Sequence, residues 1–531
     1  MKKIFNFLAY SIMKGMKNMG ETAIQRISIS KRFGKTIANE NVNLSIEKGE
    51  ILSLLGENGS GKTTLRNMLS GIYYPDSGEI YVDGKRVVIS SPKDAFDLGI
   101  GRVHQHFKLI DVFTASENIV LGLKNEPFFL SRRKINKKVK EISNRYGFDL
   151  DPKKKVYERS VSEKQIVEIR KLLYRGVHTL ILDEPTAVLT PQETERLFHI
   201  LRERKKDGKT IIIITHKLNE VLELSDRVAI LRKGKLVDRI KTSEANESIL
   251  TDAMVGEHVQ LEIERDEIPA EKKEKVLEIS HLSCTAEDGI RCLKDVSFSA
   301  YSGEILGIAG VSGSGQKVLL EAICGLQHAD NGSKILFTDH QNITEDLIGR
   351  TPKQIKHKGV RLAFVPEDRL GMGLVGDFGR TGNRRLRSYE DGKSPFINFR
   401  NPKHTAAEVK EGLNVLTPSL ETPVRTLSGG NVQKVLVGRE ISSSPRLLLT
   451  AYATRGLDIN TSYAIYNILN EQKKKGAAVI YVGEDLDVLL ALCDRILVLC
   501  DGQCTGIVSA RNTDKRTIGK RMSRNKEQNN D

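Results

Sequence analysis

Eight consecutive residues near the start of the chain have the composition of a phosphate-binding loop. Gly56-Glu57-Asn58-Gly59-Ser60-Gly61-Lys62-Thr63 fits the pattern G-x-x-x-x-G-K-[ST]. The glycines allow the backbone to wrap phosphate groups closely, and the start of the following helix favours negative charge. Lys62 is expected to reach the β- and γ-phosphates, and the Thr63 hydroxyl to bind Mg²⁺. Thr64 is a further candidate for binding the nucleotide. The pattern predicts that the chain binds ATP together with Mg²⁺.

Two acidic residues end an apolar run about 120 residues later. Leu180-Ile181-Leu182 is followed by Asp183 and Glu184. Asp183 is expected to hold Mg²⁺, directly or through water, and Glu184 to polarise the water that attacks the γ-phosphate. Alone, such a pair is more often a helix cap or a surface charge, but its position after a phosphate loop favours catalysis.

Three further residues are candidates for the same site. His216 follows the buried run Ile211 to Thr215, where it can touch a γ-phosphate. Gln105 is expected to contact Mg²⁺ and the water. Phe33 is a candidate for stacking on adenine, although a lone Phe is a core residue by default.

These residues require a scaffold in which strands and helices alternate. Ile51 to Leu55, Thr179 to Leu182 and Thr210 to Thr215 read as buried strands, and a helix is expected from Thr64 to Gly71. Alternation of this kind predicts an α/β fold with a mostly parallel sheet covered on both faces. Phosphate sites in such folds lie beyond the carboxyl ends of the strands.

The chain repeats itself at long period. Gly49-Glu50-Ile51-Leu52 recurs 254 residues later as Gly303-Glu304-Ile305-Leu306, and Ser160 and Leu189 match Ser428 and Leu457 at an interval of 268. We therefore expect two homologous domains joined by a charged linker. The predicted parts are an extension (1–20), a first domain (21–258), a linker (259–275), a second domain (276–512) and a basic tail (513–531).

The second half has lost the chemical groups of the first. In the loop that begins at Gly310, Gln316 stands in the place of the phosphate lysine and Lys317 in the place of the Mg²⁺ hydroxyl. The strand Arg446 to Thr450 ends in Ala451-Tyr452 instead of two acids, Glu484 stands opposite His216, and Glu287 opposite Phe33. Loss of a general base costs about 10²–10⁴-fold in rate, so this half is expected not to hydrolyse ATP. Weak nucleotide binding can survive on the backbone of the loop.

Charge and hydropathy limit the classes of partner. Of the net charge of +15, residues 1–20 and 511–531 contribute +4 each. Basic ends suit a membrane surface or RNA, or are solvated tails. No run approaches the roughly 20 apolar residues of a membrane-spanning helix. The six cysteines all lie in the second half, where free thiols are the default.

Together these motifs resemble the ATP-binding cassette (ABC) superfamily. The resemblance rests on Phe33, the phosphate loop, Gln105, Asp183-Glu184-Pro185-Thr186 and His216, and on Leu427-Ser428-Gly429-Gly430-Asn431, which is similar to the LSGGQ signature. Two cassettes in one chain resemble the tandem ATPase subunits of bacterial sugar and nucleoside importers. The run from Glu184 to Glu193 is of that type, as are Pro366 to Arg369 and Thr454 to Asp458. Val103 to Phe107 and Glu117 to Gly122 favour the nucleoside branch.

The resemblance implies an architecture, cofactors and partners. Each cassette is expected to have an antiparallel β subdomain and a helical signature subdomain beside its sheet. The implied cofactors are ATP and Mg²⁺. The implied partners are membrane permease subunits in trans and, indirectly, an extracellular solute-binding protein, with the chain peripheral at the cytoplasmic face of a bacterial membrane. No nucleic acid is expected, and the cargo is a nucleoside or a simple sugar.

The resemblance also implies that each ATP lies between the loop of one cassette and the signature of the other. Ser428, Gly429 and Gly430 then serve the intact loop at Gly56. The altered loop at Gly310 meets the altered signature Arg159 to Glu163, which keeps only Ser160. The expectation is one consensus site and one degenerate site.

Two other functions remain open from the sequence. A ribosome-associated soluble tandem ABC ATPase is favoured by the basic ends and disfavoured by the short linker and unequal sites. A degenerate ATPase that only scaffolds a complex is the other. The segment Gly379 to Arg387, rich in Gly and Arg, replaces the apolar and acidic residues that the family has near the permease contact.

Overall fold

The computed structural model consists of two compact units, Met1–Leu189 with Glu193–Gln260, and Thr190–Gln192 with Leu261–Asp531. It describes residues 22–103, 108–121, 154–159, 161–187, 189–256, 263, 265, 268, 273–286, 289–358, 360, 362–388, 404, 406, 413 and 415–523. The change of unit at residue 260 falls inside the stretch expected to link two domains. The individual domain limits stay a prediction.

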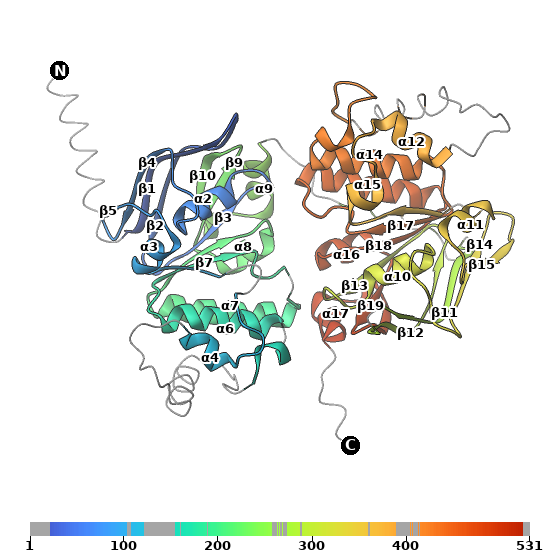
Figure 1. Cartoon of the computed structure of the whole chain (residues 1–531), viewed down its shortest axis with the longest axis horizontal. Helices are drawn as coiled ribbons and strands as arrows, with labels where there is room; N and C mark the ends of the chain where they lie inside the picture. Colours follow the sequence, from blue (N-terminus) through green and yellow to red (C-terminus); the bar gives the residue numbers. More distant parts are fainter. Residues whose placement is uncertain are drawn as a thin grey trace. The chain divides into compact units, whose positions relative to one another are not determined.

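A six-stranded sheet forms the centre of the first unit (Figure 1). Its order is β10 (Lys235–Lys241), β9 (Arg227–Arg232), β3 (Ile51–Leu55), β8 (Thr210–Ile214), β7 (Thr179–Asp183) and β6 (Ile100–Val103). All neighbours are parallel except β9 and β10. Every residue of β3 and β8 is buried, as expected for parallel strands covered on both faces.

A second, antiparallel sheet and a set of helices complete this unit. The sheet has the order β2 (Thr36–Glu47), β1 (Thr22–Phe33), β4 (Ser77–Val82) and β5 (Lys85–Val87). The helices are α2 (Lys62–Leu69), α3 (Pro92–Asp97), α4 (Ala115–Val120), α6 (Val161–Tyr174), α7 (Pro191–Lys206), α8 (Leu218–Leu224) and α9 (Glu247–Val255). In Figure 1, α6 and α7 lie along one side of the parallel sheet, whereas α2 and α3 lie on the side of the antiparallel strands.

The second unit repeats this topology. Its larger sheet has the order β16 (Leu362–Val365), β17 (Leu447–Ala451), β18 (Ala478–Val482), β13 (Glu304–Gly310), β19 (Arg495–Cys500) and β20 (Gln503–Ser509). Its antiparallel sheet has the order β12 (Arg291–Tyr301), β11 (Lys275–Thr285), β14 (Lys334–Thr338) and β15 (Thr344–Asp346). The helices are α10 (Gln316–Ile323), α11 (Pro352–His357), α12 (Arg380–Ser388), α14 (Gly429–Ile441), α15 (Ile459–Lys474), α16 (Leu486–Leu492) and α17 (Lys515–Met522).

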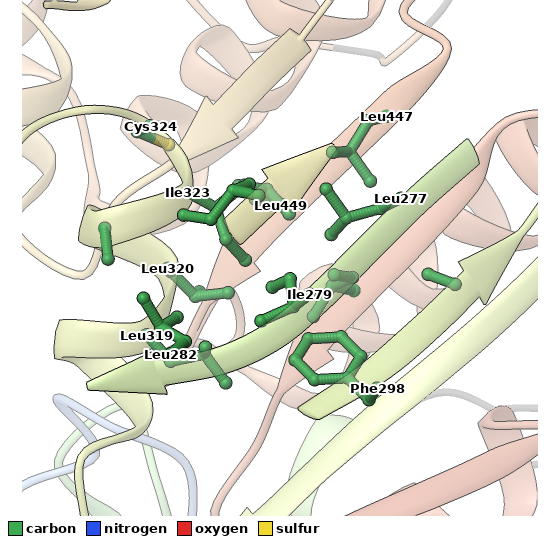
Figure 2. Close-up of a cluster of buried hydrophobic side chains, with 14 of the residues drawn as sticks. Leu277, Ile279, Leu282, Phe298, Leu319, Leu320, Ile323, Cys324, Leu447 and Leu449 are labelled. Carbon is green, nitrogen blue, oxygen red and sulfur yellow. The ribbon is translucent and has the colours of Figure 1, made fainter. Parts of the chain in front are cut away.

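The core of the second unit joins its two sheets through α10. Leu319 and Leu320 of α10 pack with Ile279 and Leu282 of β11 and with Leu449 of β17 (Figure 2). In the first unit α2 packs in the same way with β1, β2 and β3. Each phosphate loop is therefore held between a buried strand and a helix that is anchored on both sheets.

The predicted α/β fold with two tandem cassettes is confirmed, and the predicted strands differ from the observed ones by a residue at most. The helix after the first loop begins at Lys62 rather than Thr64, because Gly61 adopts the left-handed conformation at its N-cap. The strand expected over Arg446 to Thr450 is Leu447–Ala451, so Ala451 still belongs to the sheet.

Two further observations concern the membrane and the thiols. Among the described residues, no helix combines the length and the apolar composition needed to cross a bilayer. All six cysteines are free thiols, and Cys500 and Cys504 lie on neighbouring strands without a bond between them.

Candidate ATP-binding site

The first phosphate loop needs glycine at positions where the backbone passes close to its neighbours. Gly56, Gly59 and Gly61 have φ angles of 156°, 80° and 101°. A Cβ atom at Gly56 would lie 2.3 Å from the Leu231 carbonyl oxygen, and one at Gly61 would lie 2.4 Å from that of Ala38. The motif therefore has a steric reason, and the loop keeps the open backbone that a polyphosphate needs.

Lys62 occupies the inside of this loop. Its side chain is 7% exposed, and its Nζ donates hydrogen bonds to the carbonyl oxygens of Gly56 at 2.5 Å and Glu57 at 2.8 Å. Burial lowers the pKa of Lys62 to about 8, although the negative charges of Glu184 and Glu57 act to raise it. Among the described residues the buried Ser60 hydroxyl has no hydrogen-bond partner. A cation and an unsatisfied hydroxyl inside a glycine loop fit a phosphate chain.

Asp183, the predicted Mg²⁺ ligand, is the last residue of β7 and is mostly buried. Its carboxylate forms an ion pair with Arg66 of α2, and its Oδ2 lies 4.0 Å from the Arg102 guanidinium of β6. Thr63 is exposed at the start of α2. Hydroxyl and carboxylate oxygens are the donors that Mg²⁺ prefers, so the donor set fits this ion. Arg66, which is paired with the Asp183 carboxylate, competes with Mg²⁺ for that carboxylate.

Sequence reasoning did not identify Arg66 and Arg102, although the internal repeat carried a signal. In the second unit the equivalent positions hold Leu320, Phe364 and Ala451 in place of Arg66, Arg102 and Asp183. Leu320, Phe364 and Ala451 are buried members of one apolar cluster. The three charged residues of the first unit therefore form one group, which is absent as a whole from the second.

Glu184 and His216 are brought together at the ends of neighbouring strands. Glu184 has a left-handed backbone with φ of 44°, and its amide donates to the Ile214 carbonyl at 2.8 Å. The His216 Nδ1 lies 3.0 Å from Glu184 Oε1. This hydrogen bond lowers the pKa of the Glu184 carboxyl, so the group is ionised at neutral pH and can accept a proton.

The antiparallel sheet touches the loop through Asn39 of β2, whose Nδ2 donates to the Gly61 carbonyl at 3.3 Å. Phe33 lies at the end of the adjoining strand β1 and is 43% exposed. It is therefore not a core residue; its ring packs edge-on against Tyr73 at 5.1 Å. Its contact with adenine stays a prediction. Gln105 lies outside the described residues.

The intact signature begins helix α14 in the second unit. Ser428 is the N-cap, and its Oγ accepts a hydrogen bond of 2.8 Å from the Asn431 side chain. Gly429 and Gly430 form the first turn, and a Cβ atom at Gly430 would lie 3.0 Å from Thr461 Oγ1. The residues around Leu427 and Gly429 line an open pocket of about 480 Å³.

The altered signature of the first unit has a buried charge where its counterpart has Leu427. Arg159 is buried, lies 3.6 Å from Glu163 and donates to the Lys154 carbonyl at 3.0 Å. Ser160 lies outside the described residues. An arginine at this position replaces apolar packing with an ion pair.

The equivalent positions in the second unit keep the backbone and lose the chemistry. Gln316 replaces Lys62, and its Nε2 donates to the Val311 carbonyl at 3.1 Å. Tyr452 replaces Glu184 with φ of 51° and donates its amide to Val482 at 2.9 Å. Burial raises the pKa of Tyr452 to about 12, so it is protonated at neutral pH and is no base. Glu484 pairs with Arg455 at 3.1 Å, and Glu287 lies outside the described residues.

Comparison with known proteins places the chain among transport ATPases. The family model for ABC transporters matches residues 39–187 and 293–452. The nucleoside import ATP-binding protein NupA of Lactococcus lactis subsp. cremoris is 41% identical over 503 residues, covering 94% of this chain and 97% of that protein. The guanosine import ATP-binding protein NupO of Bacillus subtilis is 41% identical over 510 residues, covering 95% and 98%. The ribose import ATP-binding protein RbsA 1 of Rubrobacter xylanophilus is 36% identical over 496 residues, covering 92% and 96%.

Proposed function

The chain belongs to the ABC transporter family as an ATP-binding ATPase, and from that premise we propose that it drives the import of nucleosides. The observation that carries the cargo class is the 41% identity to a nucleoside import protein over 94% of this chain. The protein works at the cytoplasmic face of the membrane with permease subunits in trans, which receive cargo from an extracellular binding protein. The relatives give no support to the ribosome-associated alternative.

In the proposed mechanism the first cassette carries out the chemistry. Lys62 neutralises the β- and γ-phosphates from inside the loop, and the Glu184 carboxylate accepts the proton of the attacking water. His216 orients that carboxylate through the 3.0 Å hydrogen bond. Thr63, Asp183 and Gln105 would hold Mg²⁺, which would supply charge stabilisation to the phosphates. Arg66 must release Asp183 for this to happen.

The second cassette, in this proposal, supplies a signature and no hydrolysis. Ser428, Gly429 and Gly430 serve the ATP of the first loop, as the family resemblance implies. Gln316 carries no charge for a phosphate, and Tyr452 holds its proton at neutral pH. Both observations support one hydrolytic and one degenerate site.

A pair of matched substitutions tests the asymmetry. Glu184→Gln removes the base and is expected to lower the kcat of ATP hydrolysis by about 10²–10⁴-fold in the assembled transporter. Tyr452→Phe changes the equivalent position and is expected to leave kcat within about twofold. The controls are unchanged ATP binding and unchanged assembly with the permease. A comparable loss from Tyr452→Phe would contradict the assignment of a single hydrolytic site.

Uptake in intact cells tests the cargo. In a strain that lacks this subunit, uptake of labelled nucleosides should be lost, whereas uptake of ribose and galactose should persist. The wild-type chain should restore nucleoside uptake, and the Glu184→Gln variant should not. Loss of sugar uptake alone would refute nucleosides as the cargo and leave the ATPase assignment intact.

A further inference from the structure

The ends of three neighbouring strands in the second unit carry a cluster of side chains around Arg455. Arg455 forms ion pairs with Glu367, which follows β16, and with Glu484, which follows β18; the second pair joins the arginine Nε to Glu484 Oε1 at 3.1 Å. The Arg455 Cζ atom also lies 5.8 Å from the centre of the Tyr452 ring, which follows β17. One guanidinium therefore links the carboxyl ends of β16, β17 and β18, which are consecutive strands of the larger sheet.

The three linked positions correspond to those of the expected hydrolytic groups in the first unit. Glu367 is the second residue after β16, as Gln105 is the second residue after β6. Tyr452 and Glu484 stand in the places of the general base and of its histidine partner. Side chains that would gather around a metal ion and a γ-phosphate in the first unit are thus replaced by side chains that gather around an arginine.

Arg455 itself has no counterpart in the first unit. The residue 268 positions earlier is Ala187, which is exposed. The turn is the same in both units, because the Arg455 amide donates to the Tyr452 carbonyl at 3.0 Å and the Ala187 amide donates to the Glu184 carbonyl at 3.2 Å. The arginine is therefore an addition to a turn that both units share.

A three-residue insertion follows Glu367 in the second unit. Asn118 of α4, which is buried, accepts a hydrogen bond from the Ile110 amide at 2.8 Å and donates to its carbonyl at 3.0 Å. The buried Asn383 of α12 makes the same bridge to Val375, at 2.8 and 3.1 Å. The two asparagines are 265 residues apart, whereas the ends of β6 and β16 are 262 apart. The additional residues lie in the segment that contains the short helix η4 (Arg369–Gly373).

Helix η4 packs against α14, the helix that begins with the intact signature. A Cβ atom at Gly373 would lie 2.9 Å from Leu436 Cδ2 of α14, and one at Gly429 would lie 3.3 Å from Arg369 Nη1. The other terminal nitrogen of Arg369, Nη2, donates a hydrogen bond to the Arg455 carbonyl. Arg369 therefore connects Arg455 to the first turn of the signature helix.

The exposure of the cluster limits what each contact contributes. The side chains of Arg455, Glu367 and Glu484 are 55%, 34% and 45% exposed, so each ion pair alone is weak. All of these contacts nevertheless depend on one residue, and they are lost together when its side chain is removed. Removal also leaves two carboxylates without the cation between them.

We propose that Arg455 is a positioning residue, which links the strand ends of the second unit in place of a metal ion and a γ-phosphate and fixes the start of α14 through Arg369. The second unit thereby presents its signature in one arrangement without a nucleotide in its own loop. The role of Arg455 in ATP hydrolysis rests on the proposed function, because the signature then serves the ATP of the first loop.

Hydrogen–deuterium exchange of the nucleotide-free full chain tests this link. The Asn431 and Val432 amides donate to the hydroxyl and the carbonyl of Ser428, at 3.4 and 2.9 Å, and report on the first turn of α14. Arg455→Ala introduces the residue of the first unit and should raise their exchange about two- to fivefold, the contribution of one exposed ion pair. Arg455→Lys keeps the charge without the forked guanidinium and should give a smaller increase.

Two further variants separate the cluster from the general charge of this surface. Arg425→Ala removes another arginine of the same open pocket, paired with Asp377 at 2.9 Å, and should leave the exchange unchanged. Adding Glu484→Gln to Arg455→Ala should not raise the exchange further, because the glutamate acts through the arginine already removed. Equal exchange in the wild type and Arg455→Ala, or an equal increase in Arg425→Ala, would overturn the proposal.

ATP hydrolysis by the assembled transporter provides a second measurement. Arg455→Ala should lower kcat about two- to fivefold and leave the affinity of the first loop for an ATP analogue unchanged, because the signature must be ordered when the transition state forms. An unchanged kcat would refute the role in the reaction. Glu184→Gln tests the ATPase assignment separately, so a failure of the Arg455 variants would leave that assignment intact.

Discussion

The protonation of Lys62 makes ATP affinity dependent on pH in a range where an ordinary lysine would not titrate. Its Nζ is enclosed by the Gly56 and Glu57 carbonyls, and burial lowers its pKa to about 8. Only the protonated amine attracts phosphate. Because the pKa in the empty site is depressed, the binding-competent cation is present below pH 8 and is lost as the pH rises through 8.

The size of the effect follows from this pKa. With a pKa of about 8, about three-quarters of the Lys62 amines are protonated at pH 7.5 and about one-tenth at pH 9. The apparent affinity for ATP should therefore fall about eightfold across this interval, a loss of about 1.3 kcal/mol. A lysine at the ordinary value of 10.5 would leave affinity almost unchanged. Above pH 8, binding should also take up a proton.

Titration with a fluorescent ATP analogue at saturating Mg²⁺, from pH 7.5 to 9.5, measures this dependence. The titration starts at pH 7.5 because the terminal phosphate of the nucleotide itself titrates at lower pH. Phosphate monoesters have a second pKa of about 6. Glu184→Gln supplies a second check, because the Glu184 charge raises the pKa of Lys62. Its removal should move the midpoint to lower pH. An affinity that stays level up to pH 9.5 would refute the buried, depressed lysine.

Three other substitutions test the site and its supports. Arg66→Leu frees Asp183 from its ion pair and should lower the Mg²⁺ concentration needed for half-maximal ATP binding by about tenfold, the worth of one hydrogen bond to a charged group; an unchanged requirement would contradict competition. Asn383→Ala removes a buried bridge and should cost about 2–3 kcal/mol, measured as a lower urea midpoint; a loss below about 0.5 kcal/mol would refute the bridge. Gly56→Ala places a methyl group 2.3 Å from the Leu231 carbonyl and should abolish binding of the ATP analogue; near-normal binding would show that the loop tolerates a side chain there.

The sequence was sufficient to predict the fold and the location of the phosphate loop. Buried strands such as Thr210–Ile214 consist mostly of consecutive apolar residues, here four isoleucines after Thr210, and the glycine pattern is short and local. The repeat at fixed intervals then predicted that the second unit copies the first. Signals of this kind need only neighbouring residues or a comparison of the chain with itself.

The ion pairs around Asp183 could not be predicted in the same way. Arg66 and Arg102 lie on a helix and a strand that are far from Asp183 in sequence. Arg102 approaches Asp183 because β6 pairs with β7, and Arg66 does so because α2 packs on the same sheet. The hydrogen bonds of the Asn118 and Asn383 side chains could not be predicted for the same reason. A buried asparagine in a short helix reads as a polar surface residue until the path of the preceding loop is known. Side-chain partners of this kind depend on tertiary register.

The left-handed backbone at Tyr452 has a consequence for how such a chain changes over time. Glu184 and Tyr452 adopt nearly the same φ, 44° and 51°, and each donates its amide to the neighbouring strand. A left-handed residue other than glycine costs about 1–2 kcal/mol, and the second unit retains it without a catalytic carboxylate. The hydrogen bond to the neighbouring strand is therefore sufficient to maintain this turn without a carboxylate. A duplicated cassette can therefore lose catalytic side chains while its backbone keeps the conformation of the active form. Point mutations that restore those side chains would then need no change of fold.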